Sequence, residues 1–160
     1  MNLREFYLER RRAEYPAFVR VLDALPADRL AYRAHERSPS AAELAWKIVH
    51  ATRTSLDVAT THRGESNASP PPPLAEMREH FAGWSEELVA RVTSMDDAAW
   101  DQPARFFHKG ALVLEQPAGA FLWFILFDSI HHRGQLAAYL RPMGGKVPSI
   151  YGPSADDRGR

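Results

Sequence analysis

Apolar residues recur at spacings of three and four along four stretches of the chain, which is the period of an amphipathic helix. The pattern predicts helices over residues 3–25, 41–60, 74–95 and 118–141. The most regular apolar stripe, in the third stretch, consists of Leu74, Met77, Phe81, Trp84, Leu88 and Val92. The fourth stretch is apolar on all sides over residues 121–127, which predicts burial of most of its surface. The sequence therefore predicts an all-α protein, a four-helix bundle.

Several residues predict where these helices begin or bend. Ser40 and Glu43 have the spacing of a capping box, in which each side chain accepts a hydrogen bond from the other's backbone N–H. Pro117 suits the first turn of the fourth helix. Pro16 lies inside the first stretch and predicts a kink there or a division into two helices.

The connections between the helices are unequal. Residues 63–73 end in four consecutive prolines and predict a long crossover loop within the bundle. Lys109 and Gly110 indicate a turn, and residues 111–114 predict a short strand or an extended segment packed on the bundle before the last helix. We expect residues 1–160 to form one domain, with residues 152–160 as a flexible tail.

Composition narrows the function classes. Twenty basic and twenty acidic residues give a net charge of zero, so a nucleic-acid partner is not expected. The run Arg10-Arg11-Arg12 is flanked by Glu9 and Glu14, and is interpreted as a solvated helix face. The chain has no cysteine and no apolar stretch of the ~20 residues that a membrane helix requires. We therefore expect a cytoplasmic protein with no membrane partner.

Polar residues directly follow the apolar run of the fourth helix. Asp128 and His132 are four residues apart and fall on one helix face, the spacing with which bundles build metal sites. The second helix offers Lys47 and His50, again one turn apart. His50, Asp128 and His132 would form a two-histidine, one-carboxylate set suited to a divalent metal with open positions.

A metal-free interpretation is equally open. Lys47 and Asp128 would then form a buried ion pair, with His132 as its hydrogen-bond partner and no vacancy for a metal. His131 is expected to hydrogen-bond a loop or a partner helix, and Arg133 to be a surface or interface charge. Gly134 is unfavourable in a helix by about 1 kcal/mol relative to alanine, which predicts the close approach of a neighbouring helix.

Three segments carry a family resemblance. The fourth helix contains HHRGQL at residues 131–136, the tail reads VPSIYGPSAD at residues 147–156, and the second helix begins SAAELAW at residues 40–46. With these motifs in this order, the chain resembles the DinB-like family over nearly its whole length. The resemblance implies a four-helix bundle that holds a divalent metal, nickel or zinc, through three histidines. It also implies that the chain is a homodimer.

The resemblance places the metal ligands on particular residues. One family ligand lies in the second helix and two, four residues apart, lie in the fourth. His132 matches the last of these, whereas Asp128 stands at the other fourth-helix position and Lys47 at the second-helix position. A carboxylate can bind a metal, but an ammonium group has no lone pair to donate. Either His50, one turn beyond Lys47, replaces the missing ligand, or the site holds no metal.

Two functions follow from these alternatives. Some relatives resemble thiol S-transferases that use bacillithiol or mycothiol, which implies a metal-dependent transferase or hydrolase with His131 or Gln135 orienting ligands or substrate. The alternative is a non-catalytic small-molecule-binding or stress-related bundle in which the Lys47–Asp128 pair replaces the metal. Its cavity would be walled by Trp46, Phe124 and Tyr139.

Overall fold

The computed structural model describes residues 2–66 and 69–159 of the chain. This part is mostly helical. Its helices are α1 (Leu3–Asp23), the 3₁₀ turn η1 (Ala27–Arg29), α2 (Ala41–Thr61), α3 (Leu74–Ser94), α4 (Asp97–Asp101) and α5 (Ala118–Leu140). Its strands are β1 (Arg63–Glu65), β2 (Pro103–His108) and β3 (Ala111–Pro117). The long helices thus begin and end within two residues of their predicted bounds.

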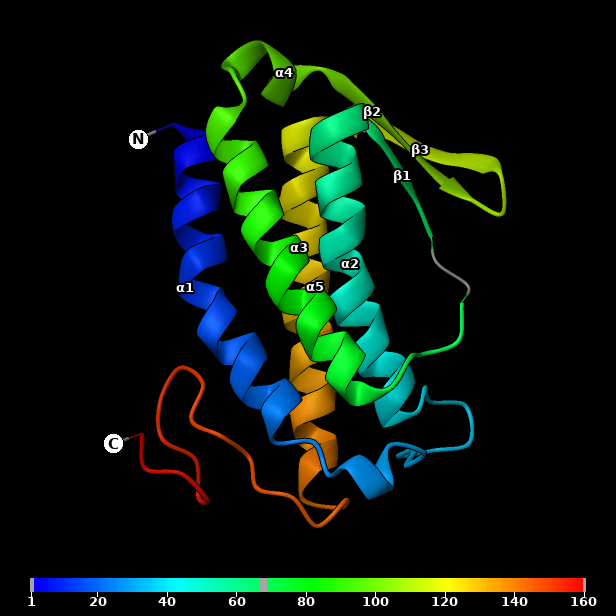
Figure 1. The fold of residues 1–160 in the computed structure, drawn as a ribbon, viewed down its shortest axis with the longest axis vertical. Helices are drawn as coiled ribbons and strands as arrows, with labels where there is room; N and C mark the ends of the chain where they lie inside the picture. The colour runs from blue at the N-terminus through cyan, green and yellow to red at the C-terminus, as the bar shows by residue number, and fades with distance from the viewer. Residues whose placement is uncertain (1, 67–68, 160) are drawn as a thin grey trace.

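The longer helices α1, α2, α3 and α5 lie side by side, with α4 across one end of the group (Figure 1). Helix α2 packs against both α3 and α5, and α1 packs against the same two helices. Their facing stripes bury a core whose largest apolar members include Tyr7, Phe18, Phe81, Phe121 and Leu122. Burial of each such phenylalanine or leucine side chain contributes roughly 1.5–3 kcal/mol. Within residues 2–66 and 69–159, none of these helices could cross a membrane.

The helix ends follow the sequence signals. The predicted capping box is present at the start of α2, where Glu43 N donates to Ser40 Oγ and Ser40 N donates to the Glu43 carboxylate. Helix α1 runs without a break through Pro16, so the chain does not divide there. Helix α2 ends at Thr61, and the next residue, His62, caps it in a left-handed conformation with φ of 54°. That reversal sends the chain directly into β1.

A small three-stranded sheet corrects the all-α prediction. Its order is β1-β2-β3, with β1 parallel to β2 and β2 antiparallel to β3. Strand β1 falls at the start of the predicted crossover loop, residues 63–73. A three-residue strand has no recognisable periodicity, and its partner β2 begins nearly forty residues later, so the local sequence did not reveal it. Gly64 allows β1 to lie close to α2, because an added Cβ would be 3.0 Å from Val58.

The hairpin between β2 and β3 confirms the predicted turn and extended segment. Lys109 and Gly110 both have positive φ, 51° and 78°, and His108 pairs with Ala111 across them. Two left-handed residues between paired strands are typical of the tight hairpin turn that follows the twist of the strands. In Figure 1 the hairpin projects outward past α2, from the end of the group where α4 lies.

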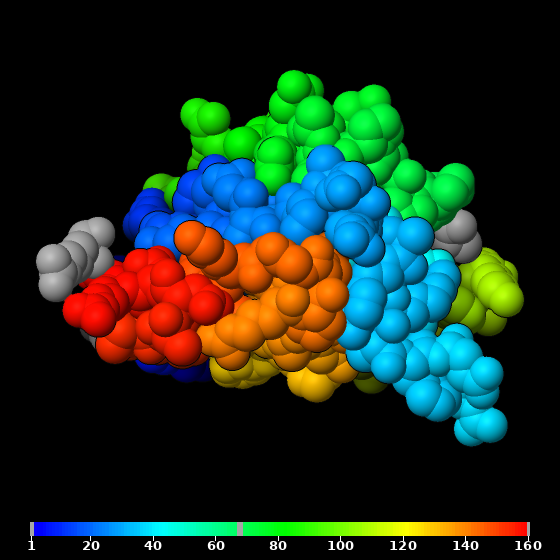
Figure 2. Space-filling view, turned by 90° about the horizontal axis from the view of Figure 1, so that it is seen from below, coloured from blue at the N-terminus to red at the C-terminus, as the bar shows by residue number. Residues whose placement is uncertain are grey.

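The C-terminal segment lies against the end of the helices near α1 (Figure 2). Asp156 accepts hydrogen bonds from Val147 N (3.0 Å) and Arg141 Nε (2.9 Å), and Asp157 accepts one from Ser149 N (2.8 Å). The flexibility expected of residues 152–160 stays a prediction, and Arg160 lies outside the described residues.

Candidate functional site

A cavity of about 540 Å³ lies between α2, α5 and the hairpin. Its apolar walls come from Trp46, Phe106, Val113, Leu114, Phe121, Phe124 and Ile125. Its polar lining includes Glu43, Lys47, His50, Thr54 and Asp128. A mainly apolar pocket with a few convergent polar groups is the usual form of a small-molecule site.

Helix α2 presents one polar stripe to this cavity, because Glu43, Lys47, His50 and Thr54 recur at spacings of three and four. The His50 ring lies 5.5 Å from Trp46 between ring centres, and its Nδ1 is 3.5 Å from the Thr54 hydroxyl. Burial lowers the pKa of His50 below the ordinary value of 6.5. His50 is therefore neutral at pH 7 and can accept a proton.

Helix α5 contributes a second histidine in the opposite state. His132 Nε2 lies 3.3 Å from Asp128 Oδ2, and His132 Nδ1 lies 2.8 Å from Gln135 Oε1. Both ring nitrogens thus face oxygen acceptors, which favours the imidazolium form. The hydrogen bond from His132 lowers the pKa of Asp128, and the same bond raises the pKa of His132. Asp128 and His132 form an ion pair at the edge of the cavity.

The predicted Lys47–Asp128 ion pair is not formed. Lys47 is exposed, and no carboxylate among the described residues lies within ion-pairing distance of it. Its positive charge nevertheless acts on Asp128, whose pKa it helps to lower. Asp128 pairs with His132 instead, because a residue one turn away on the same helix meets it without the loss of freedom that a long lysine chain would suffer.

The predicted three-ligand metal set is only partly assembled. Asp128 and His132 are together, but no group of three or more His, Asp or Glu side chains in the described residues is placed to hold a metal ion. His132 has no lone pair free, because Asp128 and Gln135 occupy both of its nitrogens. The Lys47 charge further opposes a cation. As they are arranged, these side chains do not fit nickel or zinc. Binding of either metal, which the family resemblance implies, stays a prediction.

The other residues singled out in the sequence have separate surroundings. Trp46 lines the cavity and donates its indole N–H to Ser69 Oγ at 3.3 Å. His131 is exposed beside the His132 ring. Tyr139 lies away from the cavity lining, where its hydroxyl donates to Pro39 O and its ring meets Tyr32 edge-on.

The sequence did not reveal the hairpin side of the cavity. Phe106, Val113 and Leu114 reach it from β2 and β3, and Ser69 and Pro71 reach it from the loop before α3. The apolar run at residues 111–114 is a weak signal, because it does not show which surface that segment covers. The walls become visible only when segments distant in sequence are packed together.

Two further expectations for α5 are corrected. Arg133 is not a surface charge: only 2% of it is exposed, and it pairs with Glu14 of α1. Tyr151 completes this cluster by accepting from Arg133 and donating to Glu14. Gly134 has no close neighbouring helix, since an added Cβ would meet nothing within 4 Å. Helix α5 therefore turns His132 and Arg133, which are adjacent in sequence, towards different partners.

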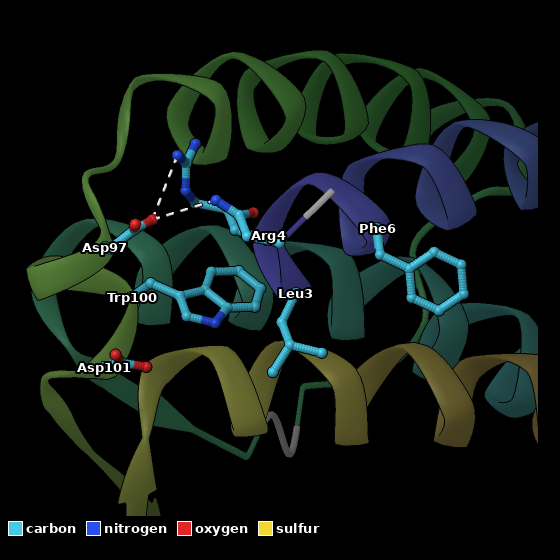
Figure 3. A pocket seen from close by; sticks show the side chains of 7 residues that line it. Leu3, Arg4, Phe6, Asp97, Trp100 and Asp101 are labelled. Carbon is cyan, nitrogen blue, oxygen red and sulfur yellow. Dashed lines mark hydrogen bonds and ion pairs between the residues drawn. The ribbon is translucent and has the colours of Figure 1, made fainter.

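A second cavity, of about 620 Å³, lies at the start of α1 beside α4 (Figure 3). Leu3, Phe6 and Trp100 line it, and its charged Arg4 and Asp97 side chains pair with each other at 3.5 Å. The first cavity differs because it contains a lysine without an ion-pair partner among the described residues, and a histidine with a lowered pKa. These features make it the better candidate site.

Comparison with known proteins gives a consistent picture. The model of the DinB family matches residues 3–158. An uncharacterised Bacillus subtilis protein, YrdA, is 40% identical over 43 residues, which are 27% of this chain and 26% of that protein. The match thus spans about a quarter of the relative.

Solved structures share the fold. A DinB-like protein from Bacillus cereus has a TM-score of 0.74 at 21% identity, covering 92% of this chain and 97% of its own. One from Bacillus subtilis has a TM-score of 0.68 at 20% identity, covering 88% and 92%. A mycothiol-dependent maleylpyruvate isomerase has a TM-score of 0.56 at 12% identity, covering 92% of this chain and 63% of its own.

Proposed function

The chain belongs to the DinB family, and we propose that the cavity between its α2, α5 and hairpin binds a small organic anion with an apolar body. The observation that carries this proposal is the pairing of apolar, largely aromatic walls with one lysine, Lys47, that has no ion-pair partner among the described residues. The walls would bury the body of the ligand, and Lys47 would meet its oxyanion.

The charges around the cavity favour an anion. Asp128 and His132 neutralise each other, and Glu43 pairs with Arg33 at 2.9 Å. His50 is neutral at pH 7 because burial lowers its pKa. Lys47 is therefore the positive charge of the site that no ion pair among the described residues offsets. An exposed ammonium adds modest affinity, and burial of an aromatic ring against Trp46 and Phe121 would supply most of the rest.

The proposed binding requires no metal. The Asp128–His132 pair acts as a fixed polar edge of the cavity, and its Gln135 contact holds the imidazolium in place. This distinguishes the proposal from nickel- or zinc-dependent chemistry, for which His132 would have to lose a proton and turn a nitrogen towards the metal.

The test uses 2-naphthoate, an aromatic carboxylate, followed by quenching of tryptophan fluorescence. We expect Lys47→Met to weaken binding about threefold, because an ion pair made by an exposed ammonium contributes roughly 0.7 kcal/mol. Lys109→Met, on the hairpin turn, is the matched control and should bind as the wild type does. Equal binding by Lys47→Met and wild type would contradict the role of Lys47.

A second candidate function is catalysis on a thiol or hydroxyl substrate, with His50 as the general base. The observations that favour it are the neutral state of His50 at the cavity wall and the shared fold with a mycothiol-dependent isomerase. His50→Gln would then abolish turnover while retaining naphthoate binding. Assays with a low-molecular-weight thiol and an electrophilic acceptor test this, and activity unchanged in His50→Gln would exclude that role.

We further propose that a second copy of the chain covers the outer side of this cavity. Phe124 and Phe127 of α5 are 58% and 61% exposed, and Val113 of β3 is exposed beside them on the hairpin. Phe124 and Val113 also line the cavity, so a partner would close it. Light scattering after size exclusion tests this: wild type should be a dimer and Phe127→Lys a monomer. A monomeric wild type would contradict it.

A further inference from the structure

A second polar site lies on the opposite side of α2, around Arg11. The sequence pattern placed the run Arg10-Arg11-Arg12 on a solvated helix face, but Arg11 is only 4% exposed. Its Nη2 donates to Thr52 Oγ1 of α2 at 2.8 Å and to Ser85 Oγ of α3 at 3.3 Å. Its Nε is buried and has no hydrogen-bond partner among the described residues. Arg11 therefore places a guanidinium inside the junction of three helices.

No carboxylate neutralises this guanidinium. Among the described residues, Arg11 forms no ion pair, whereas the other buried arginine, Arg133, pairs with Glu14. The groups around the guanidinium are uncharged rings, with the Phe18 and Phe81 ring centres 5.9 and 5.8 Å from its central carbon. Burial disfavours the charged form, yet an arginine side chain remains protonated. A buried, uncompensated charge is costly, and an anion that reached it would remove part of that cost.

The structure also provides access to this charge. A cavity of about 390 Å³ between α1 and α3 has Arg11 in its wall, together with Arg12, Tyr15, Ser85 and Glu86. Ala82 and Val89 add apolar surface. This cavity shares no lining residue with the cavity that contains Lys47. It is a separate opening on another face of the molecule.

From this geometry we propose that the Arg11 cavity is a second binding site, for a small monocarboxylate whose carboxylate meets the Arg11 guanidinium and whose short apolar chain lies on Ala82 and Val89. The two arginines and Glu86 together give the cavity one net positive charge. That balance suits a monoanion better than a dianion. Ser85 accepts from Arg11 and keeps its own O–H free, so it would donate that hydrogen to the carboxylate.

The test is a titration of the whole protein with sodium propionate, using sodium chloride at equal ionic strength as the control. The readout is the ¹⁵N-detected NMR signal of the Arg11 Nε–H, assigned by its loss in Arg11→Met. We expect propionate to shift this signal saturably and to raise the melting temperature. Both effects should persist in Lys47→Met, which separates this site from the proposed ligand cavity.

Two variants make the proposal falsifiable. Arg11→Met should fold, because it removes a buried charge and keeps an apolar stem, and it should lose the propionate-dependent rise in melting temperature. Glu86→Gln removes an exposed like charge and should tighten propionate binding roughly threefold. An unshifted Arg11 signal, a rise in melting temperature retained by Arg11→Met, or tighter binding of inorganic phosphate than of propionate would each overturn the proposal.

Discussion

Two charged clusters on adjacent turns of α5 have opposite surroundings. Arg133 is buried, pairs with Glu14 of α1 and is covered by Tyr151 from the C-terminal segment. Asp128 and His132 pair with each other within the helix, and 43% of the Asp128 side chain remains exposed at the cavity. The first cluster joins three parts of the chain, whereas the second leaves its polar atoms accessible. Accessibility, not the presence of charge, separates a site from a structural contact here.

The sequence does not distinguish these clusters, because His132 and Arg133 are neighbours. Successive residues of a helix point about 100° apart around its axis, so His132 and Arg133 face different neighbouring elements. Helix α1 and the tail bond to Arg133, whereas Asp128 lines a cavity between α2, α5 and the hairpin. The four predictions below test this difference, beginning with the largest effect.

Removal of Glu14 should have the largest effect on stability. Glu14→Leu leaves the Arg133 guanidinium buried without its carboxylate, which should lower the free energy of unfolding by about 3 kcal/mol. Urea denaturation measures this loss. Glu9→Leu is the matched control, because the Glu9–Arg10 pair is exposed and its loss should change stability by less than about 0.5 kcal/mol. Equal losses for both variants would show that the buried pair is not structural.

Tyr151→Phe should have an intermediate effect. It removes the hydroxyl that donates to Glu14 Oε2 at 2.8 Å and accepts from Arg133, at a cost of about 1 kcal/mol. The C-terminal segment should also exchange its amide hydrogens faster, with Ser149 N as the reporter because it donates to Asp157. Exchange at Ser149 that matched wild type would mean that Tyr151 does not hold this segment.

Asp128→Asn should destabilise the protein least. Its pair with His132 is partly exposed, so we expect a loss of no more than about 0.5 kcal/mol in urea denaturation. A loss as large as that of Glu14→Leu would remove the distinction between the two clusters, and would make Asp128 part of the structural core.

The smallest effect is electrostatic and can be followed by NMR titration of the histidines. The pKa of His132 should lie above 6.5 and that of His50 below it, since His132 bonds to Asp128 and His50 is desolvated. Asp128→Asn should lower the pKa of His132 and leave that of His50 unchanged. A pKa of His132 below 6.5 in the wild type would contradict the ion pair.

The same pKa shifts determine how the contribution of the Asp128–His132 pair to stability depends on pH. Because the pKa of Asp128 is lowered on folding, its contribution is complete above the ordinary value of 3.8 and is lost as pH falls through the folded value. Because the pKa of His132 is raised, its contribution is complete below 6.5 and is lost as pH rises through the folded value. The pair therefore stabilises the protein most between pH 3.8 and 6.5.

Much of the fold was predictable from local signals. The apolar periodicity gave the long helices, Ser40 and Glu43 gave the start of α2, and Lys109 with Gly110 gave the hairpin turn. Strand β1 was not predictable, because three residues carry no period and their pairing with β2 is non-local. The same limit applies to the cavity, whose hairpin wall comes from another part of the chain.

The candidate site was predictable as a set of residues but not as a set of interactions. Lys47, His50 and Asp128 line one cavity, as their helical spacing allowed. Spacing could not show that Asp128 would pair with His132 and not with Lys47. It also could not show that Gln135 would hydrogen-bond to the other ring nitrogen of His132. Those choices depend on side-chain conformations and on which charges remain in water. The buried states of Arg11 and Arg133 were missed for the same reason.

The central claim is that this cavity binds an organic anion without a metal. The most direct measurement is the affinity for 2-naphthoate in protein treated with EDTA and dialysed, compared with the same protein after one equivalent of nickel or zinc is added. We predict equal affinity in both samples, and equal affinity in a His132→Ala variant with either metal. The claim would be contradicted if EDTA abolished naphthoate binding and added metal restored it in the wild type but not in His132→Ala.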